Sequence, residues 1–348
     1  MSQVNSQIWT EKKDDLRLLK MELREVLITR RIPEPGMAMI SRECKIRLWD
    51  EDRPIPREKL LEMAKGVSGI VCMLTDRIDA VAMDSAGAGL KVIATMAVGF
   101  DNIDINEATR RGIVVGNTPG VLTDATADLT WALMLSLGRR IVEGDRMMRK
   151  RGFTGWSPTL LLGADFAGKT LGIIGMGRIG TAVAKRASGF RMRVIYFDPN
   201  QLSPEKEKEL NARSVSLLDL LKESDFVCLH CPLSKDTFHL IGEKELGMMK
   251  KSAYLINVSR GAVIDEKALV SALVNGKIAG AALDVYEQEP ELSAGLAELD
   301  NVVLVPHIGS ASIDTRNQMA VMTAQNLIAG LAGELPPFCV NPQAMSKG

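Results

Sequence analysis

The chain contains three histidines, and one of them, His307, stands where a proton donor could act. His307 lies in VPHIGS, directly after the apolar run NVVLV, so it is predicted at the carboxyl end of a strand. Ligands of open α/β sheets bind outside such strand ends. His230 ends an earlier predicted strand beside Pro232 and could line a ligand groove, whereas His239 lies in a polar stretch and is expected at the surface or at a cap. The residues alone leave a structural role for His307 as open as a catalytic one.

A glycine-rich turn provides the second chemical signal. Gly175, Gly177 and Gly180 form G-x-G-x-x-G between the apolar strand LGII and the helix RIGTAVAKRA. The first glycine allows a tight turn, the second lets a pyrophosphate approach the backbone, and the third lets the helix pack on the strand. The helix N-terminus favours the pyrophosphate through its free N–H groups. The predicted cofactor contacts in this turn are Gly175, Met176, Gly177, Arg178, Ile179 and Gly180.

The residue that ends the next predicted strand, Asp198, favours NAD(H) over NADP(H). Its carboxylate can accept hydrogen bonds from both ribose hydroxyls of NAD(H), whereas it would repel the 2′-phosphate of NADP(H). No arginine stands at 199–201, and Lys206 and Lys208 are predicted on the following helix. Binding of NADP(H) would require Lys206 or Arg178 to swing towards the phosphate.

These groups need a framework, and the sequence predicts two series of short apolar strands that alternate with helices. The first series is expected at 25–30, 45–49, 69–74, 91–96 and 112–117; the second begins at KTLGII and continues at 193–198, 225–230, 253–258, 278–285 and 301–307. This alternation indicates parallel βαβ units. A chain of 348 residues has room for two such domains.

A long helical pattern from about 122 to 151 separates the two series. Thr123 and Asp124 are suitable N-cap residues, and a helix of this length could bridge two domains or two subunits. Its apolar residues need cover on more than one side, so we expect a homodimer. These residues include Leu129, Trp131, Leu133, Leu135 and Leu137. A last helix, at about 312–330, is expected to return to the first domain because no strand follows it.

Composition excludes several classes of protein. Apolar residues make up 46% of the chain and charged residues 25%, which excludes a disordered chain. Lys plus Arg and Asp plus Glu both number 43, so no net charge attracts nucleic acid or a membrane surface. No apolar run is long enough to span a bilayer and the N-terminus is polar, so the cytoplasm is the expected location. The lone C-x-x-C at Cys228 and Cys231 supplies half a zinc shell, so no metal site is predicted.

Nearly the whole chain from about Met21 resembles the D-isomer-specific 2-hydroxyacid dehydrogenases, most closely their glyoxylate/hydroxypyruvate reductase branch. The shared stretches are AVGFDNIDINEATRRGI, NTPGVLTDATADL, GIIGMGRIG, NVSRGAVIDEKAL, AGAALDVYEQEP and VPHIGSAS. The resemblance implies hydride transfer between a nicotinamide and C2 of a small 2-oxo acid such as glyoxylate or hydroxypyruvate.

The resemblance also implies an α/β architecture of two domains that face each other across an active-site cleft. These are a Rossmann-type NAD-binding domain at 119–308 and a discontinuous, flavodoxin-like substrate domain at 21–118 and 309–348, with residues 1–20 as an N-terminal extension. Crossovers near Pro119 and Gly309 would form a hinge, and its closure would exclude water from the site.

The resemblance assigns roles to individual residues. Arg260 is expected to bind the substrate carboxylate, Glu289 to pair with the catalytic histidine, and His307 to act as acid and base. These roles agree with their chemistry, because arginine binds carboxylates bidentately and a glutamate beside a histidine favours the imidazolium. From the residues alone, Arg260 and Glu289 would be interpreted as solvated loop charges. The backbone of Val98 and Gly99 is expected to complete the carboxylate site. Further cofactor contacts are expected at Pro232, Val258, Ser259, Arg260, Asp284, His307 and Gly309.

Trp156 matches a tryptophan of the glyoxylate reductase branch that can reach the active site of the neighbouring subunit. If it limits the pocket, glyoxylate and hydroxypyruvate should be better substrates than bulky 2-oxo acids. The alternative interpretation is an aromatic residue of the core or of an interface.

Other members of the superfamily are alternatives. Formate dehydrogenases carry Gln where Glu289 stands and are disfavoured. A short phosphoglycerate dehydrogenase or a phosphonate dehydrogenase fits parts of the pattern, although phosphoglycerate dehydrogenases often carry a regulatory domain and phosphonate dehydrogenases depart at the EP stretch. A co-repressor or scaffold that senses NADH is the alternative outside enzymes, and such proteins usually carry long tails.

Overall fold

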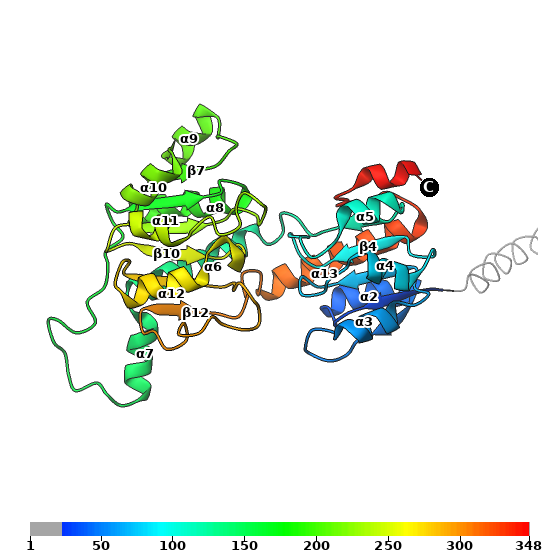
Figure 1. Ribbon diagram of the computed structural model, residues 1–348, viewed down its shortest axis with the longest axis horizontal. Coiled ribbons are helices and arrows are strands. Elements are labelled where there is room, and N and C mark those ends of the chain that lie inside the picture. Colours follow the sequence, from blue (N-terminus) through cyan, green and yellow to red (C-terminus); the bar gives the residue numbers. More distant parts are fainter. Residues whose placement is uncertain (1–22, 348) are drawn as a thin grey trace, which may run out of the picture. The chain divides into compact units, whose positions relative to one another are not determined.

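The structure is a computed structural model, and it describes residues 23–347. The expected N-terminal extension at 1–20 lies outside these residues. The described residues form two compact units: the first contains residues 23–119 and 316–347, and the second contains Gly120–Thr315 (Figure 1). The chain returns to the first unit after Thr315, beyond the boundary expected at 308–309. Gly309 still belongs to the second unit, where its N–H donates to Asp284 at 2.8 Å.

The first unit is built on a five-stranded parallel sheet in the order β2-β1-β3-β4-β5. Its strands are β1 (Arg24–Ile28), β2 (Cys44–Leu48), β3 (Gly69–Cys72), β4 (Val92–Thr95) and β5 (Val114–Gly116). β3, β4 and β5 are buried throughout, as parallel strands covered by helices on both faces must be. This strand order is that of flavodoxin-like folds, as the resemblance implied.

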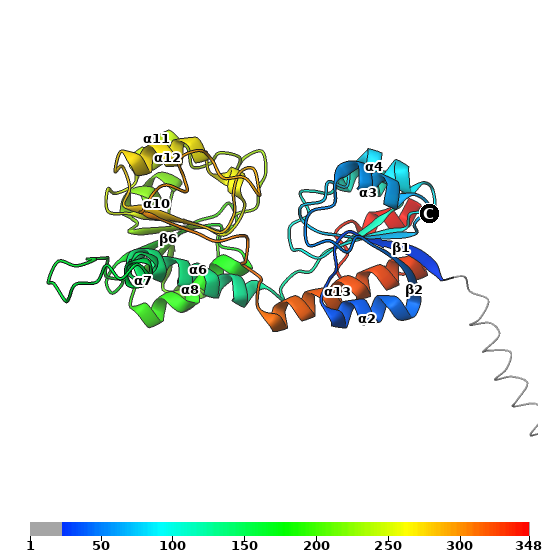
Figure 2. The ribbon, with the colours of Figure 1, turned by 90° about the horizontal axis from the view of Figure 1, so that it is seen from below.

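Helices cover both faces of this sheet. They are α2 (Glu34–Glu43), α3 (Arg57–Ala64), α4 (Ala80–Ala86), α5 (Ile105–Arg110) and α13 (Ile313–Ala332), with a final 3₁₀ segment η3 (Pro342–Lys347). α2 and α13 lie together on one face, and α3 and α4 lie on the other (Figure 2). Gly36 of α2 allows the close packing of the first pair, because a Cβ there would lie 2.5 Å from the carbonyl oxygen of Ala320.

The second unit contains a seven-stranded parallel sheet in the order β12-β11-β10-β9-β6-β7-β8. Its strands are β6 (Thr170–Ile174), β7 (Arg193–Phe197), β8 (Ala212–Ser214), β9 (Phe226–Leu229), β10 (Tyr254–Asn257), β11 (Gly280–Leu283) and β12 (Val302–Leu304). Counted from β6, this is the 3-2-1-4-5-6 order of dinucleotide-binding sheets with one strand added. The sequence did not predict β8, which has only three residues and none with a large apolar side chain.

Two hydrophobic clusters fill the two faces of this sheet. Trp131 and Met134 pack with Cys228 on one face, while residues that include Leu220 and Leu246 fill the opposite face. The helices of this unit are α6 (Thr123–Gly138), α7 (Ile141–Arg149), α8 (Arg178–Ala187), α9 (Pro204–Leu210), α10 (Leu217–Glu223), α11 (Glu243–Met248) and α12 (Glu266–Val274), with single turns η1 (Ser188–Phe190) and η2 (Gly261–Val263). Figure 2 shows α6 and α8 on one side of the sheet and α10, α11 and α12 on the other.

The prediction of one long helix at 122–151 was wrong. The chain forms α6 and α7, which are separated by Arg139 and by Arg140, whose φ of 52° is left-handed. A remote segment ends α6, because the N–H of Ala164 donates to the carbonyl of Gly138 at 2.7 Å. The expected caps also differ: Leu122 is the N-cap residue without a side-chain bond, and Asp124 pairs with Arg186 instead.

Within residues 23–347, no helix is long and apolar enough to cross a membrane.

Candidate active site

His307 and Glu289 form a close pair in the second unit. His307 follows β12 and has a left-handed backbone with φ of 53°. Its Nδ1 lies 2.9 Å from Oε2 of Glu289 and 3.1 Å from Oε1. The N–H of Tyr286 also donates to Glu289 Oε1, at 3.1 Å. Both side chains of the pair are about one quarter exposed, at 26% for His307 and 24% for Glu289, so a ligand can reach them.

The surroundings of Glu289 keep it ionised. Burial alone would raise its pKa, but the hydrogen bond and charge of His307, the N–H of Tyr286 and the charge of Arg260 outweigh burial and lower the pKa. An ionised carboxylate only accepts hydrogen bonds, so the proton on this side belongs to His307 Nδ1. The other ring nitrogen, Nε2, is therefore left to exchange a proton with a ligand.

Asp284 fixes the turn that carries His307. Its Oδ1 accepts from the N–H of Ile308 at 2.6 Å, and its Oδ2 accepts from the N–H of Gly309 at 2.8 Å. Burial raises the pKa of Asp284 to about 6, although these two hydrogen bonds and the charge of His307 act in the opposite direction. Asp284 and Gly309 were predicted as cofactor contacts, and in this structure they are bonded to each other.

Arg260 lies in a short loop after β10. Asn257 shapes this loop: its Nδ2 donates to the carbonyl of Arg260 at 2.8 Å, and its Oδ1 accepts from the N–H and the hydroxyl of Ser259 at 3.0 and 2.9 Å. The next residue, Gly261, packs directly on the loop before Glu289, because a Cβ there would lie 1.8 Å from the carbonyl carbon of Tyr286. The loops that carry Arg260 and Glu289 are therefore in backbone contact.

The glycine-rich turn after β6 has the form that a dinucleotide requires. Gly175 has φ of 94°, and a Cβ there would lie 2.5 Å from the N of Cys231. A Cβ on Gly180 would lie 2.1 Å from the carbonyl oxygen of Gly175, so only glycine lets α8 approach the turn. A Cβ on Gly177 would meet nothing within 4 Å, which leaves open space beside the first residue of α8, Arg178. This open space at a helix N-terminus suits a pyrophosphate.

Asp198 lies beside this turn, directly after β7. Its Oδ2 accepts from the N–H of Met176 and its Oδ1 from the N–H of Asn200, each at 2.7 Å. The carboxylate is thus held next to the glycine-rich turn, where the ribose of a dinucleotide lies in this type of sheet. Pro232 and Val258 follow β9 and β10 at the same carboxyl edge.

His230 adds an observation that the sequence suggested only in part. Both of its ring nitrogens are buried and have no hydrogen-bond partner among residues 23–347. Burial lowers the pKa of His230 to about 3, so the ring is neutral near pH 7. The backbone N–H of His230 donates to the carbonyl of Ile174 at 2.7 Å, and Ile174 immediately precedes the glycine-rich turn. Buried polar atoms without partners are costly, and a bound dinucleotide would supply partners at this place. The residues present therefore fit a nicotinamide dinucleotide.

The remaining predicted site residues lie apart from this group. Val98 and Gly99 belong to the first unit, in the loop between β4 and α5, where Asn117 Nδ2 donates to the carbonyl of Val98 at 2.8 Å. Their contact with the substrate stays a prediction. Trp156 is 83% exposed on the segment that follows α7, so it is not a core residue of this chain. Cys228 and Cys231 are free and buried, and no cluster within 23–347 has three His, Cys, Asp or Glu placed to hold a metal.

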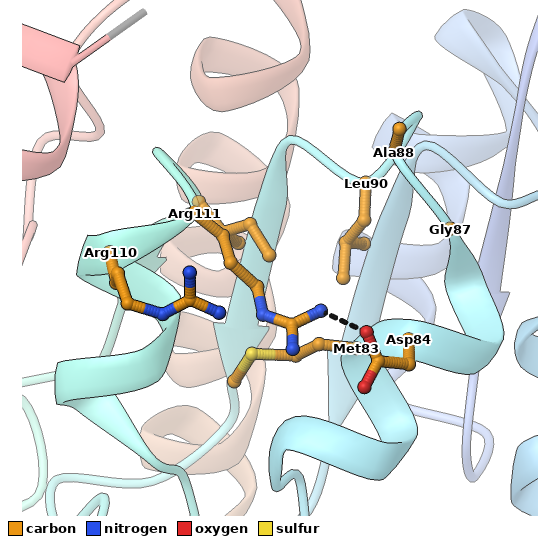
Figure 3. A pocket seen from close by; sticks show the side chains of 8 residues that line it. Met83, Asp84, Gly87, Ala88, Leu90, Arg110 and Arg111 are labelled. Atoms are coloured by element: carbon orange, nitrogen blue, oxygen red, sulfur yellow. Dashed lines mark hydrogen bonds and ion pairs between the residues drawn. The ribbon is translucent and has the colours of Figure 1, made fainter.

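A surface pocket of about 420 Å³ lies elsewhere, in the first unit. Figure 3 shows Arg110 and Arg111 at its edge, beside the helix that carries Asp84. Both arginines pair with Glu107 at 2.6 Å, and Arg111 also pairs with Asp84 at 2.6 Å. Because these carboxylates neutralise the arginines, the pocket offers no unbalanced charge for an acidic ligand. It lies before the amino ends of β4 and β5, at the edge opposite Val98 and Gly99.

Comparison with known proteins defines the class. The family model described as "D-isomer specific 2-hydroxyacid dehydrogenase, NAD binding domain" matches residues 131–309. The chain belongs to this family, and its second unit contains the NAD-binding domain.

Individual relatives cover almost the whole chain. A protein of Thermococcus litoralis named glyoxylate reductase is 53% identical over 93% of this chain and 98% of its own length. The glyoxylate reductase of Pyrococcus horikoshii is 53% identical over 92% of this chain and 97% of its own. A crystal structure of a glyoxylate reductase from Paecilomyes thermophila has a TM-score of 0.82 at 37% identity, covering 93% of this chain and all of the other. An NADPH-dependent glyoxylate/hydroxypyruvate reductase from Sinorhizobium meliloti has a TM-score of 0.79 at 29% identity, covering 92% and 98%.

Proposed function

We propose that this protein reduces a small 2-oxo acid, glyoxylate or hydroxypyruvate, with NADH. The observation that carries the proposal is the pair of His307 Nδ1 and Glu289 Oε2 at 2.9 Å, at the same edge of the sheet as the glycine-rich turn. The names of the relatives from Thermococcus litoralis and Pyrococcus horikoshii support glyoxylate as a substrate.

Each member of the proposed site has one task. When bound, the reduced nicotinamide supplies the hydride that C2 of the oxo acid accepts. Arg260 holds the carboxylate of the substrate and so orients its carbonyl group. The Nε2–H of His307 donates a proton to the carbonyl oxygen as negative charge develops there, and Glu289 stabilises the imidazolium before this transfer. Backbone N–H groups at Val98 and Gly99 are proposed to complete the carboxylate site.

We propose NADH as the preferred cofactor because of Asp198. Its carboxylate lies beside Met176 of the glycine-rich turn, where a 2′-phosphate would meet like charge. The nearest lysine on α9, Lys206, is already paired with Glu209 at 2.9 Å. The related reductase from Sinorhizobium meliloti is NADPH-dependent, so the choice has to be measured for this chain.

We propose that the protein is a homodimer. The apolar residues of α6 that suggested a dimer from the sequence, among them Trp131, Leu133 and Leu137, are buried in the core of the chain itself. We therefore place the contact at α7 and at the segment 150–163, which we call the arm. The arm projects from the second unit in both ribbon views (Figures 1 and 2). It exposes large apolar side chains, namely Phe153, Trp156, Leu160 and Leu162, and α7 exposes Ile141 and Met148. Apolar patches of this kind mark protein interfaces. In such a dimer, Trp156 would limit the size of the partner's substrate.

A spectrophotometric assay of NADH oxidation with a panel of 2-oxo acids tests the function. We expect kcat/KM to be highest for glyoxylate and hydroxypyruvate, lower for pyruvate and lowest for phenylpyruvate. If none of these acids supported the oxidation of NADH, the proposal would be contradicted. A ranking led by phenylpyruvate would refute the role of Trp156, and light scattering that shows a 37.9 kDa monomer would refute the dimer.

A further inference from the structure

Glu266, the first residue of α12, is a carboxylate with an unusual position. Its side chain is only 2% exposed, although charged residues are seldom buried without a compensating partner. Neither Glu266 Oε1 nor Oε2 forms an ion pair within residues 23–347; both accept neutral hydrogen bonds. The N-terminus of a helix of nine residues stabilises a negative charge, but it does not explain why this charge is buried.

The two bonds of Glu266 reach both ends of one segment. Oε1 accepts from the N–H of Glu287 at 2.7 Å, and Oε2 accepts from the hydroxyl of Ser293 at 2.7 Å. Glu287 and Ser293 flank Glu289, the partner of His307. One buried carboxylate therefore ties down the segment 287–293 before and after the residue that contacts the proposed acid.

Other contacts reinforce this arrangement. The N–H of Glu266 donates to Oε2 of Glu287 at 3.4 Å, so the two glutamates bond to each other's backbone. The other carboxylate oxygen of Glu287, Oε1, lies 3.0 Å from Nε2 of His239. Gly261 packs closely against the backbone of Tyr286 and Glu287. The start of the segment, at Glu287, is thus held by α12, by the loop of Arg260 and by His239.

We propose that Glu266 is a positioning residue: it fixes the segment 287–293 so that the carboxylate of Glu289 stays within hydrogen-bond distance of His307 Nδ1. The inference rests on the proposed function, because it matters only if His307 transfers a proton. Glu266 touches neither His307 nor Glu289 directly and acts through the backbone of Glu287. Displacement of a catalytic group by about 1 Å can cost about 100-fold in rate, so a carboxylate that holds this segment can control turnover without contacting the substrate.

The variant Glu266→Ala tests the proposal, with Glu266→Gln as the conservative control. In Glu266→Ala, we expect kcat to fall by about 10-fold to 100-fold. The KM for the oxo acid and the dissociation constant for NADH should change by less than about threefold, because Arg260 and the glycine-rich turn are untouched. The acidic limb of the kcat profile should move to higher pH, because contact with His307 outweighs burial and lowers the pKa of Glu289, and a displaced Glu289 loses that contact.

Glu266→Gln keeps an oxygen for the N–H of Glu287 and an amide that can donate to Ser293, so it should restore kcat and the pH profile. Ser293→Ala removes one anchor and should have a smaller effect. Glu243→Gln is a matched surface control, because Glu243 is also the first residue of a helix but is 81% exposed. It should behave like the wild type.

A spectroscopic measurement separates this inference from the proposed function. The chain has only three histidines, so histidine-labelled NMR can follow the Nδ1–H of His307 that is shared with Glu289. We expect this downfield proton signal in the wild type and in Glu266→Gln, and its loss or shift in Glu266→Ala. An unchanged signal and pH profile in folded Glu266→Ala would overturn the inference, as would a loss of thermal stability with normal kcat. A wild type that reduces no 2-oxo acid would count against the proposed function alone, because the signal would still report the position of Glu289.

Discussion

The polar side chains at the carboxyl edges of the two parallel sheets have different kinds of partner. At the edge of the second unit, ionisable side chains from separate loops face one another, as His307 and Glu289 do at 2.9 Å. At the edge of the first unit, polar side chains fix the loops instead: Asp76 accepts from the hydroxyl of Thr29 and from the N–H of Met73, and Asn102 Nδ2 donates to the carbonyls of Met73 and Asp76 at 3.0 and 2.8 Å.

This difference suggests that the second edge carries the reactive groups and that the first edge fixes the shape of its loops. Burial raises the pKa of Asp76, and the hydrogen bonds from Thr29 and Met73 with the charge of Arg30 only partly offset it. Asp76 fixes the loops through these two hydrogen bonds. In the second unit, by contrast, the contacts of Glu289 lower its pKa and keep a charge beside His307. We therefore expect variants of His307 and Glu289 to change kcat, and variants of the first edge to change KM.

The largest effect is expected for His307→Ala. General acid catalysis is typically worth about 10²-fold to 10⁴-fold, so kcat should fall by that factor. NADH binding, followed by fluorescence titration, should stay close to that of the wild type because the glycine-rich turn is unchanged. Near-normal turnover would remove His307 from the mechanism and erase the contrast between the two edges.

Arg260→Ala should follow. Loss of a charged partner that holds a carboxylate costs about 2–5 kcal/mol, which corresponds to about 30-fold or more in kcat/KM. Both KM and kcat should suffer, since the substrate loses orientation as well as affinity. Arg260→Lys keeps the charge without the bidentate geometry and should recover only part of the activity. A change in KM alone would show that Arg260 binds without orienting.

Asp198→Ser should have an intermediate effect, confined to cofactor choice. The wild type should use NADH with higher kcat/KM than NADPH. In the variant, the ratio of the two kcat/KM values should fall by about tenfold, which corresponds to the removal of about 1.4 kcal/mol of repulsion between the Asp198 carboxylate and the 2′-phosphate. The same oxo acid is used in all four measurements. Equal use of NADPH by the wild type would show that Asp198 does not discriminate.

The smallest effect is expected for Asn102→Ala in the first unit. Loss of its two hydrogen bonds should lower the free energy of unfolding by about 1–2 kcal/mol and raise the KM for the oxo acid a few-fold, with kcat nearly constant. Asn275→Ala removes a comparable amide at the end of α12 and serves as the control. A large fall in kcat in Asn102→Ala would show that the first edge also takes part in the chemistry.

The sequence was most informative where a local pattern carries its own physical reason. The glycine-rich turn, the alternation of apolar strands and the family motifs predicted both sheets and the loops of Arg260, Glu289 and His307. The sequence failed where contacts between remote residues determine the structure. The N–H of Ala164 donates to the carbonyl of Gly138 at the end of α6, and no residue near Gly138 in the sequence predicts this hydrogen bond. The bond between Glu266 and Ser293 is hidden for the same reason, because residues that meet across loops leave no periodic signal. His230 was predicted at a strand end, but only the structure shows that its two ring nitrogens lack hydrogen-bond partners among residues 23–347.

The closure of the arm at its base has an evolutionary consequence. Gly163 and Ala164 return to the end of α6, where the N–H of Ala164 donates to the carbonyl of Gly138, so α7 and the arm together leave and rejoin the second unit at neighbouring points. Insertions in a loop closed in this way cost little, since the entropy of closure grows only slowly with length. Descendants of this chain can therefore lengthen, shorten or recompose the arm while His307 and Glu289 stay unchanged. If Trp156 limits the substrate as proposed, substitutions there change the size of the accepted 2-oxo acid and leave these two residues in place.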